Sequence, residues 1–418
     1  MVASKLQTSR AKGLSASLGA QQPLPVQHRR SMCRVVAHAT RAVAVDAAVD
    51  AAPKQSKCPF AGLASFLPHE TVRAPPTPVT KAGGPAFSNP HLWLAAGMPG
   101  QNIPNRLVSG LRKLDLKEFL IELPHEMPHE LGLKKRALAD PARRRECIAC
   151  EPSSLLAQWE LLEVFLEHLP SHFPNLYTVR GEGDDRTVEV HPTGDVYRVS
   201  DYVECPLELC NLIVQEDLVL CRPDPPEGVD MNALPKGAAV PHVMSAAVVV
   251  FSFNDLPQKL SQPLQFIHAP VPGFEDQLLP LVAKTFTAIT PATPLWRNNW
   301  AFADNGDLDR PVYGSDDAAA SRLAAAGLAP EQRWLKTEYQ TLRRLPASGH
   351  VLFTVRTFVE PLPDIAAAPG AAEALAGSIR CLTPAMLAYK GLPTEEAVGK
   401  VVEYLDGLAA ADEAAKGA

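Results

Sequence analysis

Two long strand-like segments separated by a short turn constrain the fold of this chain more than any other feature. Residues 333–342 and 351–358 are rich in β-branched and aromatic side chains, which favour extended structure. The residues Pro346-Ala347-Ser348-Gly349 between them form a turn of hairpin length. We therefore expect an antiparallel sheet with helices packed on one side of it, which is an α+β layer arrangement.

The rest of the chain predicts further helices and strands around this hairpin. Ser153 or Ser154 caps a helix whose apolar residues fall at helical spacing and which ends before Pro170. A second helix begins at Cys205-Pro206 and runs into Glu216-Asp217. The expected strands are 176–180, 187–191, 196–199, 244–253 and 296–303, and helices at 384–389 and 394–408 are expected to pack on the sheet.

The N-terminal segment has the composition of a targeting sequence rather than that of a folded domain. Residues 1–45 contain seven Lys and Arg residues, no acidic residue, and scattered Ser and Ala. This pattern predicts an organelle transit peptide, and its Ser content favours a chloroplast over a mitochondrion. Residues 46–104 are expected to form a Pro-rich flexible leader, residues 105–410 the folded domain with its C-terminal helices, and residues 411–418 a disordered tail.

Charge, hydropathy and motif content argue against several functional classes. The formal net charge is −6, and the body after residue 45 is more acidic still, which argues against nucleic acid as a partner. No apolar run approaches the roughly 20 residues needed to cross a bilayer, so no membrane span is expected. No strand is followed by a G-x-G-x-x-G motif, so neither a nicotinamide nor a flavin is expected in this chain.

Two apparent metal motifs do not meet the requirements of metal binding. His125-Glu126-Met127-Pro128-His129 matches the H-E-x-x-H pattern of zinc proteases, but Pro128 stands inside the helical turn that the pattern needs. We interpret this segment as a loop. Cys147-x-x-Cys150 and Cys205-x4-Cys210 match halves of metal sites, yet neither has a second half at ligand spacing nearby. The eight cysteines are unevenly spaced and do not form a disulfide framework.

His268 is the residue whose backbone the surrounding sequence fixes most tightly. It lies in Phe266-Ile267-His268-Ala269-Pro270-Val271-Pro272-Gly273, where each proline holds φ near about −65° and forces the preceding residue into an extended conformation. The imidazole is therefore expected on a rigid loop, with a helix beginning near Phe274. A lone His among apolar residues is more often structural, but one held in this way can meet a metal or cofactor with little ordering cost.

Several other segments follow one another in the order of a known family. They are Val214-Gln215-Glu216-Asp217-Leu218-Val219-Leu220, Gln258-Lys259-Leu260, the His268 run, Trp296-Arg297-Asn298-Asn299-Trp300, and residues 336–346 followed by 351–357. Over roughly Pro104 to Leu405 the chain resembles the haem-dependent oxidative N-demethylase alpha subunits. It departs from the family pattern at Tyr339, where Arg is expected, and at Phe253-Asn254-Asp255, which replaces the usual aromatic stretch before Lys259.

The resemblance implies a PAS-like antiparallel sheet that binds haem b and oxidises a small secondary amine with dioxygen. It also implies that electrons come from a separate reductase with flavin and iron–sulfur centres. His268 is then the expected axial ligand of the iron, with His242 and His350 as alternatives, and Lys259 is expected beside the cofactor. Two other readings stay open, namely a non-catalytic haem-binding sensor or carrier and a fold that has lost haem.

The charged residues of the expected sheet supply the remaining site candidates. Alternation along residues 338–343 sends Glu338 to one face and Arg343 to the other. Arg297 or Arg343 is expected to neutralise a haem propionate or to steady bound dioxygen, and Glu338, Glu216 or Asp217 to hold the substrate ammonium. The alternative is a structural ladder in which Arg297, Glu338, Arg343 and Arg356 pair across strands.

Overall fold

The computed structural model describes residues 104–417 with the exception of 106, 108, 231–232, 236, 252–255, 310–326 and 369. The expected transit peptide (1–45), almost all of the Pro-rich leader and Phe253-Asn254-Asp255 lie outside the described residues. The last helix, α13 (Glu395–Gly417), continues into the segment that was expected to be a disordered tail. None of the helices described is long and apolar enough to span a lipid bilayer.

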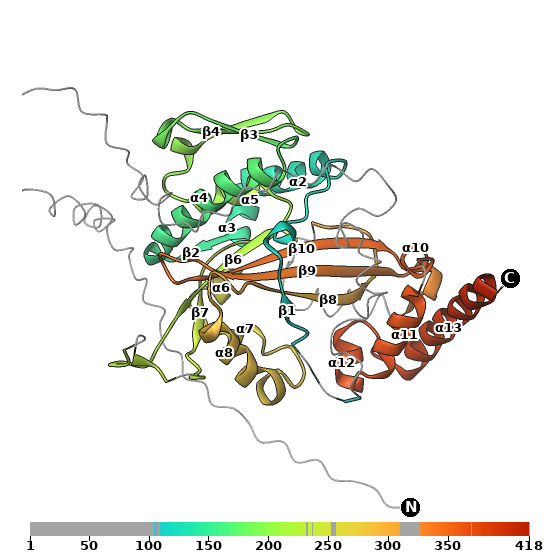
Figure 1. The fold of residues 1–418 in the computed structure, drawn as a ribbon. Coiled ribbons are helices and arrows are strands. Elements are labelled where there is room, and N and C mark those ends of the chain that lie inside the picture. The colour runs from blue at the N-terminus through green and yellow to red at the C-terminus, as the bar shows by residue number, and fades with distance from the viewer. Residues whose placement is uncertain are drawn as a thin grey trace, which may run out of the picture. The chain divides into compact units, whose positions relative to one another are not determined.

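A seven-stranded antiparallel sheet forms the centre of the fold (Figure 1). Its strands lie in the order β1-β8-β9-β10-β6-β7-β2. The expected hairpin is confirmed: β9 pairs with β10 from Val351↔Arg344 to Pro361↔Trp334. The strands are β1 (Arg112–Lys113), β2 (Ile148–Cys150), β6 (Asp217–Pro223), β7 (His242–Val248), β8 (Leu295–Ala303), β9 (Trp334–Arg344) and β10 (Val351–Pro361).

Helices cover both faces of this sheet, so the expectation of helices on one side was wrong. Figure 1 shows α2 to α5 on one side of the sheet and α7 and α8 on the other. The reason is that β6 and β7 bury consecutive residues such as Leu218 and Val219, whose side chains point to opposite faces and both need cover. The α+β class itself is confirmed, whereas the PAS-like description stays a prediction.

The helices above the sheet pack with a second, three-stranded sheet. These helices are α2 (Met127–Ala139), α3 (Pro141–Cys147), α4 (Leu155–His172) and α5 (Pro206–Ile213). The strands of the small sheet are β3 (Tyr177–Arg180), β4 (Thr187–Val190) and β5 (Asp195–Arg198), close to the three strands expected there. Phe165 and Leu169 of α4 are fully buried in the core that these elements share with the large sheet.

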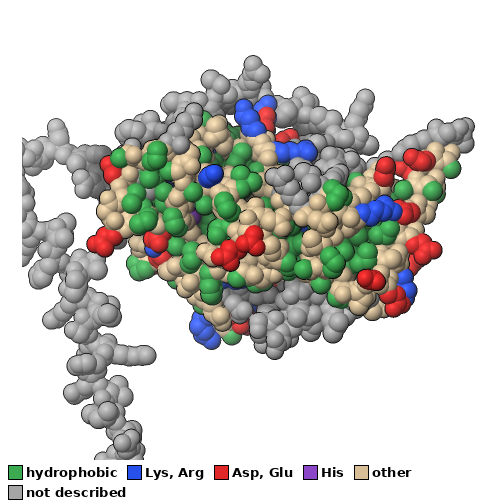
Figure 2. All heavy atoms as spheres, turned by 90° about the horizontal axis from the view of Figure 1, so that it is seen from below, with side chains coloured by type: hydrophobic (Ala, Val, Ile, Leu, Met, Phe, Trp, Pro, Cys, Tyr) green, Lys and Arg blue, Asp and Glu red, His purple; other side chains and the backbone are tan. Residues whose placement is uncertain are grey.

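The segment between β7 and β8 covers the opposite face. It contains α6 (Leu256–Lys259), α7 (Leu264–Ile267), a π-helical turn (Phe274–Leu278) and α8 (Leu279–Ala288). Phe286 and Ile289 bury against Val219 and Leu342 of the sheet. Seen from this side, the molecule presents many hydrophobic side chains (Figure 2), and Phe266 of α7 and Leu281 of α8 are exposed.

The C-terminal helices form a third core at the end of β8 and β9. They are α10 (Leu362–Ala366), α11 (Ala371–Arg380), α12 (Pro384–Tyr389) and α13. Leu375 and Leu405 pack with Trp300, Phe302 and Leu335 of the sheet. The expected packing of the late helices on the sheet is therefore confirmed.

Two helix ends differ from the sequence expectation. Helix α4 runs through Pro170 to His172, and the N–H of Phe173 bonds to the carbonyl of Leu169 at 2.8 Å, so the last turn survives the proline. Helix α5 ends at Ile213 rather than running into Glu216-Asp217, because Asp217 begins β6.

Candidate functional site

His268 lies at the C-terminal end of α7 with its ring orientation fixed by the backbone. Its Nδ1 donates a hydrogen bond to the carbonyl of Leu264 at 2.8 Å, and its ring stacks on Phe274 with centroids 4.4 Å apart. Because Nδ1 is the donor, Nε2 carries the lone pair. His268 is half-buried, and Nε2 makes no hydrogen bond among the described residues. This is the arrangement that a metal-ligating imidazole needs.

The backbone around His268 is held by a glycine as well as by the two prolines. Gly273 has φ +76°, and a Cβ placed there would lie 3.3 Å from Leu107 and 3.1 Å from Gln277. Gln277 in turn accepts a hydrogen bond from the N–H of Leu107 at 2.8 Å. Only glycine fits this turn comfortably, and the turn brings Phe274 back under the imidazole.

The electrostatic surroundings keep the His268 imidazole neutral. Burial lowers its pKa below the ordinary value, the Leu264 carbonyl opposes this, and Arg297 and Lys259 lower it further. A neutral imidazole is the form that binds metal. The structure therefore brings together three of the predicted site residues, His268, Arg297 and Lys259, from three separate segments of the chain.

Arg297 is a half-buried cation that makes no ion pair among the described residues. Its Nε is enclosed and has no hydrogen-bond partner, and burial lowers its pKa although Glu338 acts in the opposite direction. In the register of β8 and β9, Arg297 stands opposite Gln340 and Asn299 stands opposite Glu338. Paired residues share a face, so Arg297 and Glu338 lie on the same face of the sheet. A partly enclosed guanidinium without an ion pair favours an anionic ligand.

Glu338 is already surrounded by donors. Its carboxylate lies 3.1 Å from Lys336 Nζ, and it accepts hydrogen bonds from Asn299 at 3.1 Å and from Gln340 at 2.8 Å. Burial alone would raise its pKa, but Lys336 and Asn299 hold it below the ordinary value. Glu338 is thus a fixed negative charge at neutral pH beside the cation of Arg297.

Lys390 belongs to this group and was not predicted from the sequence. Its Nζ donates to the carbonyl of Trp300 at 2.6 Å and to Oδ1 of Asn299 at 3.2 Å, and it lies over the Trp300 ring. Burial and Arg297 lower its pKa to about 7. Nothing in the local sequence marks this lysine, because it follows α12 at a helix end where basic residues usually stay in solvent.

Arg343 is not brought to this group. It lies over the Phe119 ring at 5.2 Å and acts on His168, on the face of the sheet that α4 covers. The reason is the alternation of β9, which points Arg343 away from Glu338 and Gln340.

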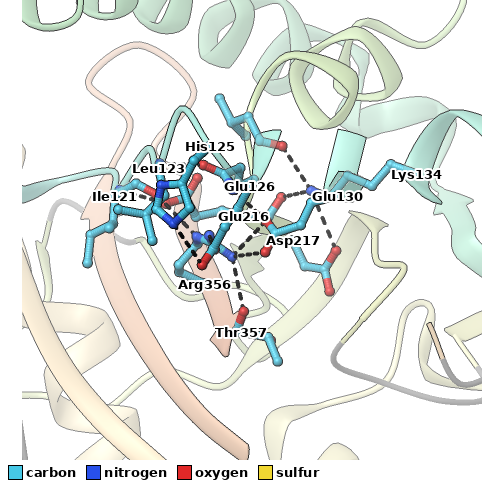
Figure 3. A network of polar contacts seen from close by, with 12 residues as sticks. Ile121, Leu123, His125, Glu126, Glu130, Lys134, Glu216, Asp217, Arg356 and Thr357 are labelled. Atoms are coloured by element: carbon cyan, nitrogen blue, oxygen red, sulfur yellow. Dashed lines mark hydrogen bonds and ion pairs between the residues drawn. The ribbon is translucent and has the colours of Figure 1, made fainter. Parts of the chain in front are cut away.

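Glu216 and Asp217 lie in a buried network around Arg356 (Figure 3). Arg356 pairs with Glu130 and Glu126 at 2.9 Å each, and Glu216 accepts the N–H of Ile121 at 2.8 Å. Asp217 accepts the N–H groups of Val250 and Phe251 at 2.9 and 2.8 Å and lies 3.9 Å from Lys134 Nζ. Their carboxylates fasten α2 and residues 119–123 to the sheet, and the structure does not bring them to His268.

The alternative histidines and the H-E-x-x-H segment have different surroundings. Nε2 of His242 and of His350 is enclosed without a partner, so neither atom is open to a cofactor. Helix α2 begins at Met127, inside the segment expected to be a loop, and Glu126 pairs with Arg356. His125 therefore lies outside the helix that carries His129, and the two imidazoles do not share a helical face.

These residues fit a haem with one protein ligand. His268 offers a fixed, neutral imidazole, and Arg297 offers an unpaired cation suited to a propionate. In the part of the chain that the structure describes, no three His, Cys, Asp or Glu side chains gather to hold a metal ion. A pocket of about 150 Å³ beside the same loop, lined by Pro272, Gly273 and Met386, has the size for a small molecule only.

Comparison with known families supports the family to which the sequence was expected to belong. The sequence model of the family described as haem-dependent oxidative N-demethylase, alpha subunit-like, matches residues 110–400. The match covers more than half of the chain and includes His268, Arg297, Glu338 and Lys390.

Proposed function

Because the chain belongs to the haem-dependent oxidative N-demethylase, alpha subunit-like family, we propose that it is a haem-dependent oxidoreductase that demethylates a small secondary amine. In the overall reaction the carbon beside the amine nitrogen gains a hydroxyl group, and the carbinolamine breaks into an aldehyde and a shorter amine. Dioxygen, two electrons and two protons enter, and one water leaves. The electrons come from a separate reductase with flavin and iron–sulfur centres.

The observation that carries this proposal is the orientation of His268. The Leu264 carbonyl fixes the tautomer with the proton on Nδ1, and Phe274 holds the plane of the ring, so Nε2 is preset as a ligand. When bound, haem b supplies the iron that activates dioxygen. Arg297 and Lys259, which both act on the His268 imidazole, would compensate the negative charge of the haem propionates.

Amine binding is assigned to Glu338 rather than to Glu216 or Asp217. All three carboxylates accept hydrogen bonds. Glu216 and Asp217, however, accept them from buried backbone N–H groups, which would lose their partners if these carboxylates bound a ligand instead. Glu338 instead pairs with the flexible side chain of Lys336, which an ammonium can displace. Asn299 and Gln340 keep its orientation during such an exchange.

An absorbance measurement on the full-length chain tests the haem ligand. Wild-type protein produced with a haem precursor is expected to show a Soret band, and His268→Ala is expected to lose it. His242→Ala is the matched control, because it removes an imidazole whose Nε2 is enclosed, and it is expected to keep the band. An unchanged Soret band in His268→Ala, or no band in the wild type, would contradict the proposal.

The amine site is tested on haem-loaded protein by calorimetric titration with a small secondary amine. Glu338→Gln is expected to weaken amine binding by about tenfold or more and to leave the Soret band unchanged, since one charged partner is worth about 1.5–3 kcal/mol. Glu396→Gln on the exposed side of α13 is the control. Equal amine affinity in Glu338→Gln and wild type would exclude this role. A Soret band without amine-dependent oxygen uptake, with reductase supplied, would point to a sensor or carrier.

A further inference from the structure

Two cysteines from different cysteine pairs of the sequence meet at the edge of the large sheet. Cys150 is the last residue of β2, and Cys205 is the N-cap of α5. Their sulfur atoms lie 4.0 Å apart, although 55 positions separate them in the sequence. Both residues are half-buried, whereas Cys147, Cys210 and Cys221 are buried.

We propose that Cys150 and Cys205 form a redox-modification site, in which a low-molecular-weight disulfide oxidises the two thiols to a disulfide bond and a dithiol reduces it again. The sulfur atoms must approach by about 2 Å to reach bonding distance. Rotation about χ1 of each side chain moves its sulfur, and β2 lies at the edge of the sheet, where it pairs with β7 on one side.

The two thiols differ in a way that defines the direction of attack. The hydrogen bond with Cys150 holds the pKa of Cys205 below its ordinary value, and the N–H of Glu208 in the first turn of α5 acts in the same direction. The same hydrogen bond, followed by burial, raises the pKa of Cys150. Cys205 is therefore the attacking thiolate, as is usual for a cysteine at a helix N-terminus, and Cys150 is the resolving thiol.

The proposed exchange balances atoms and electrons. The thiolate of Cys205 attacks one sulfur of oxidised glutathione and releases one glutathione thiolate, which leaves a mixed disulfide on Cys205. Cys150 then gives up its proton, attacks the Cys205 sulfur and releases the second glutathione. The protein loses two electrons and two protons, and the oxidant gains them as two molecules of reduced glutathione.

The other described cysteines lack these properties. Burial raises the pKa of Cys147 to about 11 and that of Cys221 to about 12, and burial also raises the pKa of Cys210. All three are buried and stay protonated at neutral pH. Cys381 is half-buried like the proposed pair but has no contact with a second sulfur among the described residues, and it serves as the matched control.

Peptide mapping of the full-length chain under a series of oxidised-to-reduced glutathione ratios tests the site. After free thiols are alkylated, cleavage after glutamate releases Cys205 on its own peptide, because Glu204 and Glu208 flank it. Fragmentation by mass spectrometry then distinguishes Cys150 from Cys147. We expect a disulfide bond to link the Cys205 peptide to Cys150 under oxidising conditions, and a dithiol to break it. We expect no linkage of Cys381 to either cysteine.

Two variants separate the steps of the exchange. In Cys150→Ser the resolving thiol is missing, so glutathione is expected to accumulate on Cys205, whereas in Cys205→Ser the remaining Cys150 is expected to react at least tenfold more slowly. The proposal is overturned if Cys150 and Cys205 of the wild type are both still alkylated at the most oxidising ratio. It is also overturned if Cys205 of the wild type keeps glutathione as fully as it does in Cys150→Ser. Neither outcome depends on haem or on the proposed demethylation.

Discussion

The protonation state of Lys390 predicts how the stability of the protein changes with pH. Lys390 is 3% exposed, and burial followed by Arg297 lowers its pKa from 10.5 to about 7, while Glu338 opposes the change. In the unfolded chain the amine returns to its ordinary pKa of about 10.4. Between these two values the unfolded chain binds a proton that the folded protein has released. The free energy of unfolding therefore rises with pH across this window, and the gain is lost as the pH falls from about 10.4 to about 7.

The size of the effect follows from the two pKa values. One proton held by the unfolded chain alone changes the free energy of unfolding by about 1.4 kcal/mol for each pH unit. Because the folded amine is still half protonated near its own pKa, the gain from about pH 7 to about pH 9 sums to roughly 2 kcal/mol. The cation–π contact with Trp300 favours the charged form and makes this figure an upper value.

Urea unfolding of wild type and Lys390→Met at about pH 7, 8 and 9 measures this contribution. The difference between the free energies of unfolding of wild type and variant cancels the titration of the groups that they share. We expect this difference to grow by up to about 2 kcal/mol in favour of wild type from about pH 7 to about pH 9. Lys400→Met removes an exposed lysine of α13 and is expected to give a constant difference. A constant difference for Lys390→Met as well would refute the lowered pKa and leave Lys390 as an ordinary charged lysine.

Two further changes test the packing that supports the site. Arg356→Met is expected to lower the free energy of unfolding by about 3–5 kcal/mol in urea titrations, because it leaves the buried carboxylate of Glu130 without its cation. The control is Arg380→Met, at an exposed arginine, which is expected to lower it by less than about 1 kcal/mol. Gly391→Ala is expected to cost about 1–3 kcal/mol, since φ is +92° and the new Cβ would lie 3.1 Å from the Phe302 carbonyl oxygen. Gly399→Ala, inside α13 with no atom near the new Cβ, is expected to raise the free energy of unfolding by about 0.5–1 kcal/mol. An equal decrease of the free energy of unfolding in Gly391→Ala and Gly399→Ala would contradict this reasoning.

The strands were predictable because their signals are local. Alternation and β-branched residues mark β9 and β10 in the sequence itself, and Pro384 marks the start of α12. That helices cover both faces of the large sheet could not be predicted in the same way. Helices α6 and α7 are only four residues each and carry little periodicity, so the cover they give to the second face emerges from packing.

Some site residues can be predicted from the local sequence, whereas others depend on residues that only the folded structure brings near them. The direction of the His268 loop follows from prolines in its own sequence, and the structure keeps the imidazole at that loop. Lys390 could not be found, because its low pKa depends on burial and on Arg297, and its partner Trp300 lies 90 positions earlier in the sequence. A buried lysine leaves no local pattern when its partners are backbone carbonyls.

The register of the strands decides the face on which each of the four charged residues of the expected ladder lies. Alternation within β9 separates Glu338 from Arg343, but only the pairing of neighbouring strands assigns Arg297 and Arg356 to a face. Arg297 stands opposite Gln340 and so shares the face of Glu338, whereas Arg356 stands opposite Tyr339 and faces the other way. The sheet therefore separates two kinds of arginine. Arg356 forms ion pairs and holds the fold together, while Arg297 makes no ion pair among the described residues and is the arginine that we propose receives the anion of a ligand.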